Sequence, residues 1–507
     1  MLGTQAPDAG LIHTEDLTRR RQRRCWRFVL RHPFTELRGW DRNRYKDEKV
    51  AGAAFPFVQR RIISVAILMS LLLTSSRSAS AYSVLTHEQL IDQSWKSTIA
   101  PILISRFPSL TPEQLAKAHA YAYGGCAIQD LGYYPSGNAF FSELTHYVRS
   151  GDFVQSLFRN AHNADELAFA IGALAHYIGD TIGHAQATNP SVAIAFPKLR
   201  SKYGSSESYE QAKNAHGEVE FAFDINQIVK QRFAPSAYLR FIGLAVPRRQ
   251  LNVSFYETYG LYIAETLGLY RTTLHTYSFG VRTFLPAFAY AEALLHGDGF
   301  PADTPGPELS FYEQHMAQLA REAEWDRYRK KPGLGIHLLA GLIVILPKIG
   351  PIKMLAIKGP NAETEKRYIE SVNLSTGALT QALASLSAPL SAEAANADSA
   401  SPPYAVLPSA RYPETPRAGL VPNRDLDTGV RILPGGYHLT DETYAKLLAM
   451  VTKDQTRPLP AALKQDILSY YADPDAPIST KRNPKKWAQV QQDLQRLTTF
   501  PTRTEPE

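Results

Sequence analysis

Apolar residues recur at helical spacing along most of the chain after residue 82. Several of these stretches follow a residue that favours the start of a helix. The starts are Thr86 with Gln89, Thr111 with Pro112, and Asn163 with Glu166. Further helical stretches are expected over 208–229, 255–275, 281–295 and 309–330. Alternation with a period of two, which predicts strands, is not evident. The pattern predicts an all-α fold over residues 82–330.

The remaining chain divides by composition. Residues 331–387 hold the apolar run 338–346, a Pro/Gly-rich break and a helix; nine apolar residues are too few to span a membrane. This run is either a buried helix under a loop or a segment that enters a lipid interface. Residues 388–430 are rich in Ala and Pro, which favours an extended linker. Residues 431–507 form a helical C-terminal region, with helices expected over 440–453, 459–472 and 485–497.

The first 81 residues have the character of a basic leader. They hold 15 Lys+Arg and 7 Asp+Glu, a net charge of +8, so the rest of the chain has a net charge of −1 and the whole chain +7. An apolar run, 62–74, follows Arg60 and Arg61 and precedes an Ala-Ser-Ala end at Ala81. This order predicts a signal peptide and export to the periplasm or the exterior; the alternative is an uncleaved anchor, for which 13 residues are short. The charge is therefore evidence of processing rather than of nucleic-acid binding.

Cysteine cannot stabilise the exported chain through an internal disulfide. The sequence has two cysteines, and Cys25 lies in the leader, so cleavage leaves Cys126 alone. Metal binding would then depend on histidine and carboxylate ligands.

Histidines and carboxylates occur at spacings that suit metal ligation. His176, Asp180 and His184 are four residues apart, so each turns only about 40° from the last and all three face one side of a helix. His216 and Glu220 repeat this spacing. A single pair of this kind is more often a surface hydrogen-bonded pair than a ligand set. His176 and Asp180, however, lie in an apolar run where burying them without partners would be costly.

Three further candidate ligands lie outside these two helices. Asp130 and His146 flank an aromatic loop, and His87 lies five residues after the predicted new N-terminus. Nitrogen and oxygen ligands together favour zinc in a chain without paired cysteines. The set as a whole predicts a zinc centre.

The order of these candidate ligands along the chain resembles that in the zinc-dependent phospholipase C family. This family shares an all-helical fold with the fungal zinc-dependent single-strand nucleases. The matching elements, over about 82–230, are THEQ, the Asp of GGCAIQD, the His of LTHYV, HYIGD and an HxxxE pair. The resemblance implies up to three zinc ions: one on Asp130, His146, His176 and Asp180, one on His184, His216 and Glu220, and one on His87, Asp180 and the free amino and carbonyl groups of Tyr82. In the family the His after HxxxD comes six residues on, whereas here that position is Gln186 and the His comes at four.

The resemblance implies a phosphodiester hydrolase that cleaves phospholipid headgroups by means of metal-activated water, with Asp130 orienting or deprotonating that water. The expected headgroup contacts are Tyr133, Tyr134, Phe140, Phe141 and Glu143, although core packing explains the aromatic residues equally well. The expected partner is a phospholipid or a membrane surface, with peripheral membrane association; no protein partner is predicted. Two alternatives stay open: a nuclease or nucleotidase of the same fold, for which nucleic acid is the substrate, and a zinc-stabilised binding protein without turnover.

Overall fold

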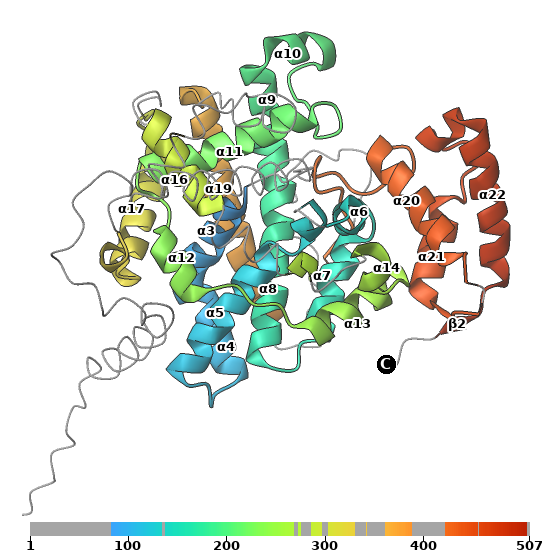
Figure 1. Cartoon of the computed structure of the whole chain (residues 1–507), viewed down its shortest axis with the longest axis horizontal. Helices are drawn as coiled ribbons and strands as arrows, with labels where there is room; N and C mark the ends of the chain where they lie inside the picture. Colours follow the sequence, from blue (N-terminus) through green and yellow to red (C-terminus); the bar gives the residue numbers. More distant parts are fainter. Residues whose placement is uncertain are drawn as a thin grey trace, which may run out of the picture. The chain divides into compact units, whose positions relative to one another are not determined.

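The structure is a computed structural model that describes residues 83–133, 137–267, 272–274, 285–296, 303–329, 341, 360–387, 421–454 and 456–503. These residues belong to one compact unit, Met69–Glu507, and are mainly helical (Figure 1). The all-α fold is therefore confirmed.

Helices account for nearly all secondary structure in the part of the chain before residue 388. The first are α3 (Val84–Ser94), η1 (Trp95–Ile99), α4 (Ala100–Arg106), α5 (Pro112–Cys126), η2 (Gln129–Tyr133), α6 (Ala139–Tyr147), α7 (Ser150–Arg159), α8 (Ala164–Gly183), η3 (His184–Thr188), α9 (Asn189–Ala195) and α10 (Pro197–Tyr203). The next are α11 (Lys213–Val229), α12 (Ser236–Ile242), α13 (Arg248–Tyr259), α14 (Ile263–Leu267), α16 (Leu285–His296), α17 (Pro307–Glu322), η6 (Trp325–Arg327) and α19 (Ala362–Ser387).

The C-terminal region is also helical, as the sequence predicts. It contains α20 (His438–Val451), α21 (Ala461–Tyr470), η10 (Ser479–Arg482) and α22 (Pro484–Thr499). Two strands of two residues each, β1 (Leu459–Pro460) and β2 (Thr502–Arg503), pair in parallel. Contacts of α20 with α6 and of α21 with α13 join this region to the preceding helices.

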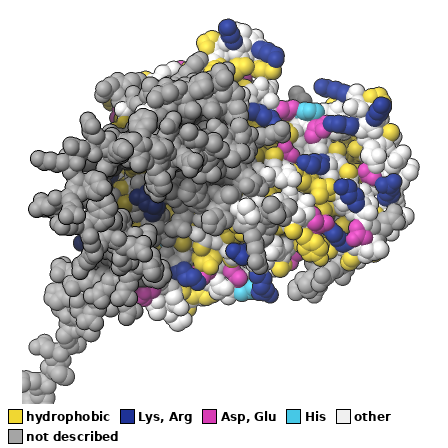
Figure 2. Space-filling view, viewed as in Figure 1, with side chains coloured by type: hydrophobic (Ala, Val, Ile, Leu, Met, Phe, Trp, Pro, Cys, Tyr) yellow, Lys and Arg dark blue, Asp and Glu magenta, His cyan; other side chains and the backbone are white. Residues whose placement is uncertain are grey.

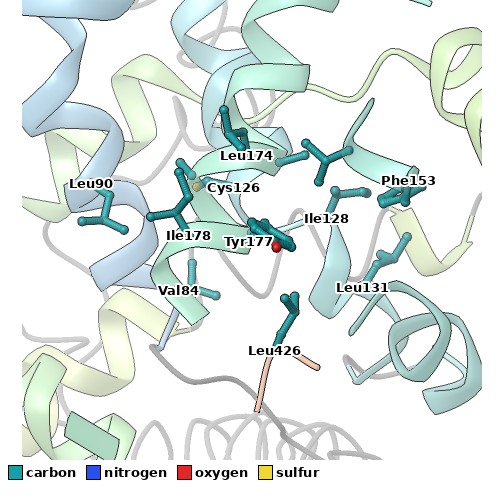
Figure 3. Packing of buried hydrophobic residues seen from close by; sticks show 14 of the residues in the cluster. Val84, Leu90, Cys126, Ile128, Leu131, Phe153, Leu174, Tyr177, Ile178 and Leu426 are labelled. Atoms are coloured by element: carbon teal, nitrogen blue, oxygen red, sulfur yellow. The ribbon is translucent and has the colours of Figure 1, made fainter. Parts of the chain in front are cut away.

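Helix α8 is the central element of the larger helical part (Figure 1). Every residue from Ala168 to Gly183 is buried, and the helix packs against α3, α5, α7 and α19. The contact with α5 depends on glycine: a Cβ on Gly172 would lie 2.2 Å from the carbonyl oxygen of Ala122, and one on Gly125 would lie 2.1 Å from that of Phe169. Figure 3 shows Leu174 and Ile178 of α8 packed among side chains from other segments.

Two of the three predicted helix starts are confirmed. Thr111 forms a capping box with Gln114, and the side chain of Asn163 accepts a hydrogen bond from the backbone N–H of Glu166. The prediction at Thr86 is wrong, because Thr86 lies inside α3; its hydroxyl donates to Asp224 Oδ1 over 2.8 Å. This tertiary hydrogen bond takes the place of a local cap.

The last ten residues of the predicted linker, 421–430, contact the larger helical part. Gln155 Nε2 donates to the carbonyl oxygen of Val421 over 2.8 Å, and the backbone N–H of Asp152 donates to Asn423 Oδ1 over 3.0 Å. The segment therefore lies against α7.

Two predicted apolar segments, 62–74 and 338–346, lie outside the described residues apart from Gly341. Among the helices that the structure describes, none has both the length and the apolar character that a membrane crossing requires. On the face drawn in Figure 2, the basic and acidic side chains of the described residues are interspersed.

Candidate metal centre

Four buried side chains from η2, α6 and α8 meet to form a first group of candidate ligands. His146 Nε2 lies 3.4 Å from Asp130 Oδ1 and 3.2 Å from Asp180 Oδ2. His176 Nε2 lies 3.2 Å from the same oxygen of Asp180 and 3.4 Å from His146 Nε2. The structure thus brings together the four residues that the resemblance assigns to one zinc ion.

The other carboxylate oxygen of Asp180 faces His87 on α3. His87 Nε2 lies 3.2 Å from Asp180 Oδ1, and the imidazole ring of His87 stacks on that of His176 with 4.2 Å between centroids. Asp180 therefore contacts imidazoles through both of its oxygens, as a carboxylate shared between two metal positions would.

A second group of candidate ligands forms where η3 meets α11. His216 Nδ1 lies 3.3 Å from Glu220 Oε1, and His184 Nε2 lies 3.8 Å from the same oxygen. All three side chains are buried. This group contains the residues that the resemblance assigns to a second zinc ion.

The helix type changes at His184, at the end of α8. His176 and Asp180 lie on regular α-helix, and the π-helix η3 begins at His184. A π-helix hydrogen-bonds from i to i+5 and is frequent at functional sites. The backbone N–H of His184 still bonds to the carbonyl oxygen of Asp180, so His184 continues the row formed by His176 and Asp180 by one further turn, where its side chain contacts Glu220 of α11.

Backbone carbonyls fix the orientation of most candidate histidines. One ring nitrogen of each lies 2.8–2.9 Å from such an oxygen, in the pairs His146 Nδ1 with Ser142, His176 Nδ1 with Cys126, His184 Nδ1 with Leu426, and His216 Nε2 with Glu207. When the ring N–H donates to the carbonyl, the other ring nitrogen carries a free lone pair on the side of the carboxylates. Metal-binding histidines usually have this arrangement.

The donor set fits zinc. The two oxygens of Asp180 and Nε2 of His184 make no hydrogen bond of ordinary geometry with the described residues, although all are buried. Leaving such atoms without partners is costly, and a metal ion would offset that cost. Imidazole nitrogens and carboxylate oxygens are the ligands that zinc takes when cysteine is absent.

The electrostatics of the first group favour a positive charge at its centre. Burial lowers the pKa of His146, but Asp130 and Asp180 outweigh this effect and raise the pKa to about 10. Burial tends to raise the pKa of Asp180, but His176 and His146 hold it well below its usual range. A zinc ion would take the place of the protons on the imidazoles, since zinc binds the neutral ring.

In the second group, burial has the dominant effect. It raises the pKa of Glu220 to about 8 and lowers the pKa of His216. Without a cation, both groups are therefore neutral near pH 7, and zinc must displace the proton of Glu220 in order to bind.

One further carboxylate in this group was not predicted from the sequence. Asp427, from the last ten residues of the predicted linker, is fully buried, and its Oδ1 lies 3.5 Å from His184 Nδ1. Single atoms of His184, His216 and Asp427 lie within 4.8 Å of one another. The only sequence signal was the pair of carboxylates in RDLDTG, in a stretch otherwise typical of a linker.

The predicted headgroup residues have different environments. The ring of Tyr133 lies 5.8 Å from that of His146, next to the first group. Phe140 and Phe141 are buried, with Lys446 Nζ 4.1 Å from the ring centroid of Phe140. Glu143 lines a cleft of about 540 Å³, together with Lys446 and other residues of the C-terminal region. Tyr82 and Tyr134 lie outside the described residues.

The fold and the two ligand groups define a class: an all-helical protein with a buried centre for several metal ions. Residues 86–268 match the model of the family described as zinc dependent phospholipase C. The match ends well before the C-terminal region. No curated protein and no solved structure matched the chain.

Proposed function

We propose that the protein is an exported zinc-dependent phosphodiester hydrolase that acts on phospholipids. The observation that carries the proposal is the shared position of Asp180, whose two oxygens lie 3.2 Å from imidazole nitrogens on three different elements, inside the domain that matches the family. The residues that would hold up to three zinc ions are Tyr82, His87, Asp130, His146, His176, Asp180, His184, His216 and Glu220.

The chemistry divides between the metal and the chain. Zinc, when bound, lowers the pKa of water to near neutrality and stabilises negative charge on phosphoryl oxygens. Asp130 is the proposed proton acceptor: its carboxylate is at the edge of the first group, 3.4 Å from His146 Nε2. His146 and His176 keep their orientation through the carbonyls of Ser142 and Cys126. No serine or cysteine nucleophile is required.

Headgroup contacts are proposed for Tyr133 and Glu143. Tyr133 lies beside His146, and Glu143 lines the cleft that also holds Lys446. An aromatic ring and a carboxylate suit a cationic headgroup such as choline. Phe140 and Phe141 would support these contacts by packing beneath them, since both rings are buried.

Charge distribution favours a lipid over a nucleic acid. The chain after residue 81 has a net charge of −1, and binding to a phosphate backbone depends on a basic surface. Export follows from the leader, and sequencing the N-terminus of the purified protein tests it, with Tyr82 as the expected first residue.

The test of the function compares two substrates. Purified protein with zinc is incubated with phosphatidylcholine vesicles and, separately, with single-stranded DNA, and the released phosphocholine and mononucleotides are measured. We expect phosphocholine, and we expect the Asp130→Asn variant to release less. Mononucleotides without phosphocholine would support the nuclease alternative instead. Zinc retention without either product would support a binding protein without turnover.

A further inference from the structure

The backbone of Leu426 contacts both groups of candidate ligands. Its N–H donates to the carbonyl oxygen of His146 over 3.1 Å, and its own carbonyl accepts from His184 Nδ1 over 2.9 Å. The side chain of Leu426 is fully buried, and Figure 3 shows it pointing toward Tyr177 of α8. The backbone of Leu426, near the end of the predicted linker, thus links a candidate ligand of the first group to a candidate ligand of the second.

Asp427 holds the neighbouring backbone of Leu426 in place. The backbone N–H of Tyr209 lies 2.9 Å and 3.1 Å from its two carboxylate oxygens, and the hydroxyl of Tyr437 donates to Oδ2. The carbonyl oxygen of Asp427 accepts from Asn189 Nδ2 over 2.8 Å. Asp427 is therefore bound to three segments: α9 through Asn189, the loop before α11 through Tyr209, and the loop before α20 through Tyr437.

The same carboxylate acts on His184. Oδ1 of Asp427 lies 3.5 Å from His184 Nδ1, the nitrogen that donates to Leu426. A negative charge beside this N–H favours the tautomer with the lone pair on Nε2, and it strengthens Nε2 as a donor to a metal. Because Tyr209 and Tyr437 already occupy both oxygens of Asp427, an orienting role suits it better than direct ligation.

We infer that Leu426 and Asp427 are positioning residues of the second zinc position, so that a region outside the matched residues 86–268 completes the metal centre. The inference rests on the proposed zinc centre. Without the segment that holds Leu426 and Asp427, His184 keeps its place on η3. It loses the carbonyl of Leu426 and the carboxylate of Asp427, which set its tautomer and ring orientation. The second position then binds zinc more weakly, while the first, built by other residues, is less affected.

Zinc affinity tests this inference directly. The number of bound zinc ions and their dissociation constants are measured by competition with a chelator for the full chain and for Asp427→Asn, which keeps the size of the side chain and removes its charge. Loss of an outer partner of a metal-binding histidine typically weakens binding by about 10-fold to 100-fold. We expect such a loss for one zinc ion, and an equal or larger loss in Asp427→Ala.

The matched control is Gln155→Ala, which removes another anchor of the same segment, the hydrogen bond to Val421, without touching a candidate ligand. This variant is expected to bind zinc like the wild type. Unchanged zinc affinity in both Asp427 variants overturns the inference, as does an equal loss in Gln155→Ala, which would indicate a general structural role. Wild-type protein that binds no zinc contradicts the proposed function instead, so the two failures are distinguishable.

Discussion

His87 Nε2 lies 3.2 Å from Asp180 Oδ1, with both side chains fully buried. The contact joins the first described helix of the chain to the central helix α8. Since the other oxygen of Asp180 faces His146 and His176, one carboxylate connects three imidazoles. Asp180 is therefore the residue on which the proposed centre depends most.

The Asp180→Asn variant is expected to lose zinc from two positions and to lose activity by more than about 100-fold, because even outer partners of a metal ligand contribute 10-fold to 100-fold. The amide keeps the shape of the side chain but removes its charge. Elemental analysis of bound zinc and phosphocholine release are the measurements.

The control for this variant is Asp165→Asn, which changes a carboxylate at the start of the same helix that pairs with Lys117. It should keep both zinc and activity. Full zinc content in Asp180→Asn would show that Asp180 does not hold metal.

The close packing of α5 and α8 gives a second prediction. Gly172→Ala places a Cβ 2.2 Å from the backbone oxygen of Ala122, so the helices must separate. Overpacking of this kind costs about 1–3 kcal/mol or more in the free energy of unfolding. Gly377→Ala in α19 meets no atom within 4 Å and should instead stabilise the protein by up to about 1 kcal/mol. Urea unfolding measures both, and equal stability of the two variants would contradict the packing argument.

Much of the candidate centre was predictable because most of the candidate ligands lie on regular helices. The four-residue spacing of His176 and Asp180, and of His216 and Glu220, places each pair on one face regardless of the surrounding fold. The structure confirms the contact within each pair. His184 shares the spacing and keeps the backbone bond to Asp180, but one turn further along the helix it contacts the second group.

Other features depend on tertiary contacts that leave no periodic signal. Asp427 contacts His184 from nearly half the chain length away in sequence, from a stretch whose composition suggests only a linker. The predicted helix 255–275 is interrupted because Gly260 adopts a positive φ of 64° and ends α13. Helical spacing predicts neither a distant partner nor the point at which a glycine stops a helix.

A buried carboxylate outside the centre gives a third prediction. Burial raises the pKa of Asp224 from 3.8 to about 7. The folded state therefore binds this proton more tightly than the unfolded state, so the contribution of Asp224 to stability is complete below pH 3.8 and is lost as the pH rises to about 7. The loss is at most about 1.4 kcal/mol for each pH unit.

The Asp224→Asn variant removes this titration. Between pH 4 and pH 7 the free energy of unfolding of the variant should rise relative to that of the wild type. Above pH 7 the difference between the two proteins should stay constant. Comparing the two proteins cancels the pH dependence of all other groups. A constant difference over this range would show that Asp224 does not titrate there.

Zinc removal gives the fourth prediction, because the centre buries several carboxylates and imidazoles that a metal ion would satisfy. Metal that binds only the folded state stabilises it by about 2.7 kcal/mol when the free ion exceeds its dissociation constant 100-fold. Treatment with a chelator should therefore lower the melting temperature, and added zinc should restore it. Calcium should not, since it prefers six to eight oxygen ligands. The Asp180→Asn variant should respond less to the chelator than the wild type. A melting temperature that stays constant after elemental analysis has shown complete loss of zinc would mean that the buried groups are satisfied within the protein, and that the centre is not built around a metal.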